Sequence, residues 1–425
     1  MDIPSFNSVN IKDYIPQQLT LSNDIPVYCF ENKDMEVICM KFVFYHAGVI
    51  FQDKYFVSSL TKTQLAQDTR DYSALSLADA MDYYGVNFSP ITSNERTILN
   101  FAFIKEYQSE VLKLIEQIIL HPLFKQDKLD ITLKNCKQEF QTKCRQTSFL
   151  AHREFMANLF GKDNPYGKYA SVSDYDKVSS EDLQAFYTKR YTFNQCYIIL
   201  AGHTDKEFFN LLNNTLGTKR WNETTADTSI KPIIINNNYE CKTIITPLQS
   251  AVQSSICIGK MFPSITDKDY IPLGVLNCLL GGYFNSRLMS NIREQKGFTY
   301  GIDSFIVPYT YGSVFMITTD VTADKDKDTM IEIFKEIEIL QSIQVSNEEL
   351  DTVKHYIIGE MLRNNDGVSE IAETFDQLLR FNLPQNYNST SMDIVKNTNA
   401  KDLMRLAKHY LSKDSFIVSI SKNIE

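Results

Sequence analysis

The chain contains an internal repeat, and this repeat limits the folds that it can adopt. The segment DLQAFYTKRYTFNQCYIILAG at residues 182–202 aligns with DLMRLAKHYLSKDSFIVSISK at residues 402–422 when one residue of slack is allowed. Both segments begin with Asp-Leu, and near the end of each stands an aromatic residue followed by an isoleucine and an aliphatic residue. They lie about 220 residues apart, which is roughly half of the chain. The pattern indicates duplication of one unit, although a single short match can also arise by chance.

Each half predicts a mixture of strands and helices. Runs rich in β-branched and aromatic residues alternate irregularly with amphipathic stretches, and residues 127 to about 160 predict one long helix. This order favours α+β layers over a regular β-α-β alternation. We therefore predict an α+β fold with a first half at residues 1–216 and a second half at residues 233–425. The polar, Thr-rich segment at residues 217–232 is the predicted linker.

Composition excludes several classes of protein. The net charge of −9 is spread along the chain without a basic block, which argues against a nucleic-acid binder. No run approaches the ~18 apolar residues of a membrane span, and the first residues lack the pattern of a secretory signal. The eight cysteines contain no C-x-x-C and predict free thiols. The expected location is the cytoplasm.

The stretch SNIREQKGFTYG at residues 290–301 suggests a binding site. Arg293 is charged at any working pH and offers a rigid fork of donors, and the Tyr300 phenol can donate to an oxyanion. If Arg293 lies near a helix end and Tyr300 at a strand start, both can face one cleft. The alternative is a surface arginine and a half-buried strand tyrosine with no role in binding.

The residues around this stretch resemble the second-half signature of the pitrilysin/insulinase family of zinc metallopeptidases, which includes the mitochondrial processing peptidase. The matching elements are a Gly-rich turn, a Ser-Arg-Leu triplet and an Arg-Glu-x-x-Gly-x-x-Tyr run, here Gly281-Gly282, Ser286-Arg287-Leu288 and Arg293 through Tyr300. The resemblance implies two homologous α+β halves related by a pseudo-twofold axis. It also implies that Gly281, Gly282, Arg293 and Tyr300 bind substrate, with Arg293 and Tyr300 acting near the scissile carbonyl.

The same resemblance implies a zinc motif, H-x-x-E-H, in the first half, with a glutamate ligand about 70 to 80 residues later. In the matching stretch FVSSLTKTQLAQDT, Ser59, Lys62 and Thr63 stand at the three motif positions. Glu139 is the only glutamate in the region of the downstream ligand, and the Lys62 ammonium would repel a divalent cation. We therefore expect no zinc and no other cofactor on this chain.

Three functions follow from the resemblance. The first is a subunit without zinc, inactive alone, that binds peptide through Tyr300 and Arg293 while a related zinc-bearing partner subunit supplies the metal. The alternative is a catalytically inactive structural or peptide-binding homologue. A self-sufficient peptidase would need a zinc site that the sequence does not contain. The expected partners are that zinc-bearing subunit and peptides, with no nucleic acid and no membrane span.

Overall fold

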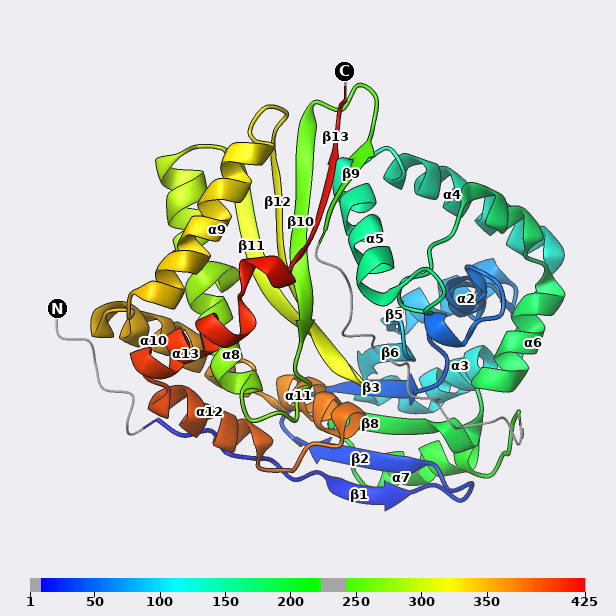
Figure 1. The fold of residues 1–425 in the computed structure, drawn as a ribbon. Helices are drawn as coiled ribbons and strands as arrows, with labels where there is room; N and C mark the ends of the chain where they lie inside the picture. Colours follow the sequence, from blue (N-terminus) through cyan, green and yellow to red (C-terminus); the bar gives the residue numbers. More distant parts are fainter. Residues whose placement is uncertain (1–8, 223–241, 425) are drawn as a thin grey trace.

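The computed structural model describes residues 9–222 and 242–424, which form two open β-sheets covered by helices (Figure 1). Within these residues the first-half sheet has six strands in the spatial order β1-β2-β8-β3-β6-β5. Its strands are β1 (Gln17–Thr20), β2 (Pro26–Glu31), β3 (Val37–Phe44), β5 (Asn87–Thr92), β6 (Thr97–Ile104) and β8 (Cys196–Gly202). The two-residue strands β4 (Asp68–Thr69) and β7 (Pro122–Leu123) pair with each other beside it.

The second-half sheet repeats the topology of the first. In the described part of the chain its order is β9-β13-β10-β12-β11, which corresponds strand by strand to β2-β8-β3-β6-β5. In both sheets the first pair of this series is parallel and the other pairs are antiparallel. The strands are β9 (Thr243–Pro247), β10 (Gln253–Phe262), β11 (Thr299–Tyr309), β12 (Gly312–Thr322) and β13 (Ile417–Lys422). The predicted α+β fold with two similar halves is confirmed.

The helices follow the same repeat. The first-half helices are α1 (Val57–Gln64), α2 (Ala74–Tyr83), α3 (Gln108–Leu120), α4 (Gln126–Lys143), α5 (Thr147–Phe160), α6 (Ser180–Arg190) and α7 (Lys206–Leu212). The second-half helices are α8 (Tyr270–Asn277), α9 (Asp326–Ser342), α10 (Asn347–Arg363), α11 (Val368–Phe381), α12 (Tyr387–Asn397) and α13 (Ala400–Tyr410). Helices α4, α5 and α6 have their counterparts about 220 residues later in α10, α11 and α13.

The prediction of one long helix at residues 127 to about 160 is wrong. The chain forms two helices there, α4 and α5, and turns between them at residues 144–146. The turn lets α5 leave the first half and pack on β10 and β13 of the second-half sheet (Figure 1). The contact is close, because a Cβ at Gly259 would lie 2.7 Å from the ring of Phe155. Tertiary packing therefore overrides a local pattern that continues through the break.

Helix α11 makes the reciprocal contact between the halves. It belongs to the second half but packs on β8 and β2 of the first-half sheet. Its buried Ile371, Phe375 and Leu378 lie on one helical face, and the Phe375 ring centre is 5.3 Å from that of Phe30 on β2. Each half therefore covers part of the other half's sheet, and the two hydrophobic cores are joined by two smaller clusters between the halves.

Two ion pairs join α11 to the turn between β5 and β6, and one of them is buried while the other is partly buried. Arg96 in this turn forms a bidentate pair with Asp376 at 3.0 and 2.6 Å, and their side chains are only 10% and 4% exposed. Its neighbour Glu95 accepts a hydrogen bond from Arg380 at 2.8 Å and others from the Tyr166 phenol and a backbone N–H of the second half. Burial alone would raise the pKa of Glu95, but these hydrogen bonds outweigh burial and lower it.

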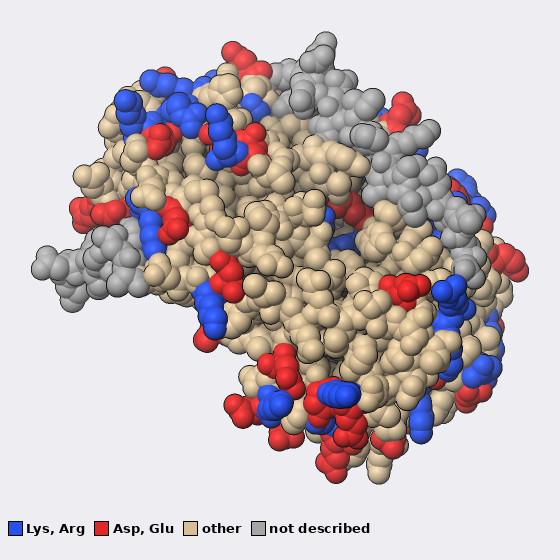
Figure 2. All heavy atoms as spheres, turned by 90° about the horizontal axis from the view of Figure 1, so that it is seen from below, with Lys and Arg blue, Asp and Glu red and all other residues tan. Residues whose placement is uncertain are grey.

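The predicted domain boundaries remain predictions, since most of the proposed linker at residues 217–232 lies outside the described residues. In the face shown in Figure 2, lysine and arginine side chains are interspersed with aspartate and glutamate and form no broad basic patch. Within the described ranges, no helix is both long enough and apolar enough to cross a membrane. The seven described cysteines are free thiols.

Candidate functional site

The structure places Arg293 and Tyr300 on neighbouring elements at the end of the second-half sheet. Helix α8 continues into the π-helical turn η6 (Cys278–Gly282), and a second π-helical segment, η7 (Met289–Gln295), carries Arg293 in its last turn. Tyr300 is the second residue of β11, which is an edge strand. Arg293 thus lies near a helix end and Tyr300 near a strand start. No hydrogen bond joins the two side chains in the described part of the chain.

A β-bulge directs Tyr300 away from the sheet. The register of β11 against β12 shifts between Thr299 and Ile302. The Thr299 hydroxyl accepts from the Gly301 N–H at 3.1 Å, and the Thr319 hydroxyl donates to the Gly301 carbonyl at 2.8 Å. A bulge of this kind redirects a side chain, and Tyr300 is 93% exposed. Its phenol is therefore available to a ligand. The residues predicted to form the site did not include these two threonines, although the isolated Gly301 near a strand start was a signal for a bulge.

Arg293 has an aromatic neighbour. Its guanidinium carbon lies 4.8 Å from the ring centre of Phe284, which is itself largely exposed. A cation above a ring at this distance is attracted by the ring quadrupole and loses part of its freedom. Arg293, Phe284 and Tyr300 are thus three accessible groups on one short segment, able to offer a cation, a ring and a phenol.

The double glycine of the signature has a packing role at its first position. Gly281 is buried against β11, and a Cβ there would lie 2.7 Å from Oγ of Ser304. The same strand is fixed to η6 by Asn277, whose amide donates to the Ser304 carbonyl at 3.1 Å. Gly282 is exposed. The expected substrate contact of Gly281 and Gly282 stays a prediction, while close packing explains why position 281 needs a glycine.

The Ser-Arg-Leu triplet is structural. Ser286 and Leu288 are buried, and Arg287 forms a bidentate ion pair with Glu349 at 2.7 and 2.8 Å. Glu349 lies in the first turn of α10, so this pair ties the segment before η7 to the start of that helix. It helps to position the segment that carries Arg293.

The three zinc-motif positions lie on one helix of the first half, as expected from their spacing. Ser59, Lys62 and Thr63 all belong to α1. The Ser59 hydroxyl donates to the Phe56 carbonyl, and the Thr63 hydroxyl donates to the Ser59 carbonyl, each at 3.0 Å. Both hydroxyls therefore serve the helix backbone. Burial lowers the pKa of Lys62, an effect that the nearby Cys136 thiol opposes.

Helix α4 brings the expected downstream region opposite α1. Cys136 and Glu139 lie on this helix, and the Cys136 thiol lies near the Lys62 ammonium. Burial raises the pKa of the Cys136 thiol and Glu139 raises it further, whereas Lys62 lowers it. Across the described residues, no group of three His, Cys, Asp or Glu side chains could hold a metal ion. An ammonium and two backbone-bonded hydroxyls do not fit zinc, which takes imidazole, thiolate and carboxylate ligands.

Strand β5, which lies next to α1, has a proline where an added strand would need a backbone N–H donor. β5 is the edge of the first-half sheet. The Ser93 N–H donates to the Arg96 carbonyl at 2.9 Å, and hydrogen-bonded and non-hydrogen-bonded pairs alternate along an antiparallel ladder. The Pro90–Leu99 pair, three positions further, is therefore non-hydrogen-bonded, and the nitrogen of Pro90 faces the free edge. Proline has no N–H there to offer an added strand. The sequence analysis overlooked this residue.

Comparisons with known proteins agree with this geometry. Residues 31–166 match the family model described as Insulinase (Peptidase family M16), and residues 177–357 match the one described as Peptidase M16 inactive domain. The chain belongs to the M16 peptidase family. This family is the pitrilysin/insulinase group that the sequence resembles, so that the predicted relationship is confirmed.

Relatives within the M16 family cover nearly the whole chain. The "Non-peptidase homolog YmxG" of Helicobacter pylori is 23% identical over 412 residues, covering 94% of this chain and 92% of that protein. The crystal structure of a protease from Helicobacter pylori has a TM-score of 0.86 at 17% identity and covers 96% of this chain and 100% of that one. The M16 inactive-domain structure from Pseudomonas fluorescens has a TM-score of 0.83 at 20% identity, covering 96% and 98%.

Proposed function

We propose that this protein is a catalytically inactive M16 homologue that binds peptides without hydrolysing them. The observation that carries the proposal is helix α1, where Lys62 stands at the glutamate position of the motif while Ser59 and Thr63 bond to the helix backbone. The relative from Helicobacter pylori that is named a non-peptidase homologue supports it. The proline on the edge strand beside α1 also supports it, because that edge offers fewer donors to an extended peptide.

In this proposal the second half binds the peptide. The exposed Tyr300 phenol donates to a peptide carbonyl, and Arg293 binds a neighbouring backbone or carboxylate oxygen. The bulge at Thr299 keeps the phenol clear of the sheet. A reducing compartment such as the cytoplasm is proposed as the location, supported by the free cysteines.

A second candidate function is that of a subunit in a two-chain peptidase. Here a related zinc-bearing chain supplies the metal and the general base, and Tyr300 and Arg293 complete its site. The exposure of Tyr300 favours this candidate, since a phenol on a side chain that is 93% exposed can reach a partner's substrate. Loss of one oxyanion donor typically lowers a rate by about 10² to 10³.

The proposed function is tested by zinc content, hydrolysis and peptide binding of the purified chain. We expect substoichiometric zinc after incubation with zinc and dialysis, no cleavage of a quenched casein peptide, and weaker binding of that peptide by Tyr300→Phe. Tyr83→Phe is the matched control, because Tyr83 is 80% exposed on α2 of the first half. Stoichiometric zinc together with cleavage that a chelator abolishes would refute the proposal.

The second candidate is tested by co-expression with a zinc-bearing relative. A stable pair that cleaves the peptide, and that loses about 10² in rate with Tyr300→Phe but not with Tyr83→Phe, would establish the subunit role. Unchanged cleavage by the Tyr300→Phe pair would leave only the inactive homologue.

A further inference from the structure

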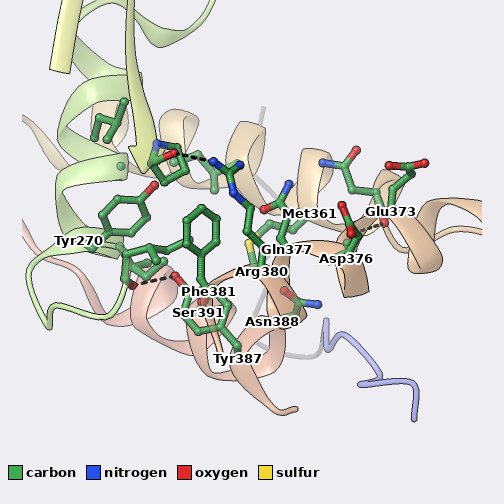
Figure 3. A pocket seen from close by; sticks show the side chains of 18 of the residues that line it. Tyr270, Met361, Glu373, Asp376, Gln377, Arg380, Phe381, Tyr387, Asn388 and Ser391 are labelled. Carbon is green, nitrogen blue, oxygen red and sulfur yellow. Dashed lines mark hydrogen bonds between the residues drawn. The ribbon is translucent and has the colours of Figure 1, made fainter. Parts of the chain in front are cut away.

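A cavity of ≈ 900 Å³ lies on the second half, and none of the described residues that line it belongs to α1. It is walled by α8, α10, α11, α12 and β11, and Arg96 and Ile98 of the first half close one side. Figure 3 looks into it, with Tyr270 and Phe381 at one end and Glu373 and Asp376 at the other. The cavity exists because α11 leans onto the first-half sheet and leaves α8 and α10 of its own half partly uncovered.

The wall of the cavity between its two ends is apolar. Ile271 on α8, Ile306 on β11 and Met361 on α10 line it and are each only half-buried. The corresponding place in the first half holds a smaller cavity of ≈ 410 Å³, which Phe56 and Phe140 border. Phe140, which holds the place on α4 that Met361 holds on α10, lies 5.4 Å from Phe56 between ring centres, and Phe56 stacks on Tyr175 at 3.7 Å. In the second half Met361 takes the place of Phe140, and the apolar wall stays accessible.

Gly274 keeps this wall open. It lies inside α8 and lines the cavity, and a Cβ at this position would meet no atom within 4 Å. A glycine inside a helix is less favourable than alanine. A larger residue would both favour the helix and fit the space. Packing therefore does not account for the glycine, and its lack of a side chain leaves the cavity open at this point.

The charges at the acidic end determine what the cavity can accept. The two arginines that line it are already neutralised, Arg96 by Asp376 and Arg380 by Glu95. Glu373 pairs with Lys41 but remains 69% exposed, and Glu370, one turn earlier on α11, forms no ion pair with any described residue. A carboxylate with no cation of its own beside an apolar wall is complementary to a ligand that combines a cation with an apolar group.

We propose that this cavity binds an extended peptide segment that inserts an apolar side chain between α8 and α10 and places a lysine or arginine beside Glu370 and Glu373. The apolar side chain lies against Ile271 and Met361, and the aromatic rings of Tyr270 and Phe381 border it. This site is separate from Tyr300 and Arg293, and it adds a preference for sequence that those two residues do not supply.

The test is fluorescence anisotropy of the full chain with a fluorescein-labelled heptapeptide, Gly-Ser-Leu-Phe-Arg-Gly-Ser. Two further peptides replace Arg by Glu or Leu-Phe by Ser-Ser. We expect the parent protein to bind the first peptide at least about tenfold more tightly than either control, since burial of one apolar side chain is worth about one to two decades in affinity.

Three variants locate the binding. Gly274→Leu fills the cavity and should weaken binding about tenfold or more, with an unchanged circular dichroism spectrum. Gly359→Leu is the matched control: this glycine also lies inside a helix with open space at its Cβ, but it is exposed and does not line the cavity. Its affinity should equal that of the parent. Glu370→Lys, at an exposed position, should weaken the Arg peptide and not the Glu peptide.

The outcomes separate this inference from the proposed function. Equal affinity of the parent, Gly274→Leu and Glu370→Lys for the Arg peptide overturns the cavity site, even if Tyr300→Phe weakens binding. Loss with Gly274→Leu and not with Tyr300→Phe supports the cavity and removes the proposed role of Tyr300. No binding of any of the three peptides by the parent overturns both. A cation preference that survives in Glu370→Lys also contradicts the cavity site.

Discussion

The ion pair between Arg96 and Asp376 gives the sharpest prediction about how the halves are held together. Replacing Arg96 by methionine keeps much of the side-chain volume and removes the guanidinium. Asp376, which is 4% exposed, would then keep the Tyr197 hydroxyl, at 2.8 Å, as its one remaining donor among the described residues. An uncompensated buried charge of this kind typically costs about 3–5 kcal/mol.

The double variant should be much less affected than either single one. In Arg96→Met combined with Asp376→Leu neither charge is left buried, and replacement of a whole buried pair by apolar groups is often neutral or even stabilising. We therefore expect Arg96→Met and Asp376→Leu each to lower the free energy of unfolding by about 3–5 kcal/mol. We expect the pair of substitutions to cost less than either alone.

Urea unfolding followed by two probes measures this. Trp221 is the single tryptophan of the chain, and it is buried in the first-half core, so that its fluorescence reports that half. Far-UV circular dichroism reports both halves. Two probes are needed because a chain of two halves need not unfold in two states. In the single variants we expect the two transitions to separate, since α11 loses its anchor on the β5–β6 turn.

An exposed ion pair provides the control. Arg363 pairs with Glu360 on the surface of α10, and Arg363→Met should change the free energy of unfolding by less than about 1 kcal/mol. If Arg96→Met were as mild as Arg363→Met, or if the double variant lost as much stability as the sum of the singles, the reasoning about an uncompensated buried charge would be refuted.

Three further predictions concern the same fold. The lowered pKa of Glu95 means that its contribution to stability is present above its unfolded value of about 4.5 and is lost as the pH falls through the lower folded value. Glu95→Gln should therefore flatten the loss of stability in acid, measured as urea midpoints between about pH 6 and pH 3. Gly281→Ala should lower the melting temperature, at a cost of about 1–3 kcal/mol from the clash with Ser304, and an unchanged melt would contradict this packing. Thr299→Val removes the hydroxyl that holds the bulge and should cost about 1 kcal/mol in thermal melts; a peptide affinity that is unaffected by it would argue against the bulge as the device that positions Tyr300.

Much of the fold could be predicted because the duplication is visible as a short sequence pattern that occurs in both halves. The helix that leads into β8 and the one that leads into β13 carry the same short pattern, and each pattern depends on residues that are neighbours in sequence. The exchange of α5 and α11 depends on contacts between residues far apart in the chain. The helical pattern continues through residues 144–146 without a glycine or proline, and therefore no local signal indicated the break.

In the candidate site, too, the features that depend on local sequence could be predicted and those that depend on distant contacts could not. The sharing of one helix by Ser59, Lys62 and Thr63 could be predicted, and so could a helix end at Arg293 and a strand start at Tyr300, because each depends on residues that are close in sequence. The hydrogen bond from Thr319 could not, since it crosses between two strands. The cavity was also missed, although Gly274 within the apolar run IPLGVLNCLL was a local signal, because an isolated glycine in a helical pattern often has a packing or functional reason.

Because α5 and α11 each pack on the sheet of the other half, neither half is a complete folding unit. A fragment ending before the second sheet would carry α5 with its apolar face bare, and it would also leave the surface of β8 that α11 covers open to water. Such fragments, produced separately, should aggregate or remain partly unfolded, and when mixed they should recover the native structure only as a pair. The ancestral unit that was duplicated would have met the same requirement by pairing with a second copy of itself.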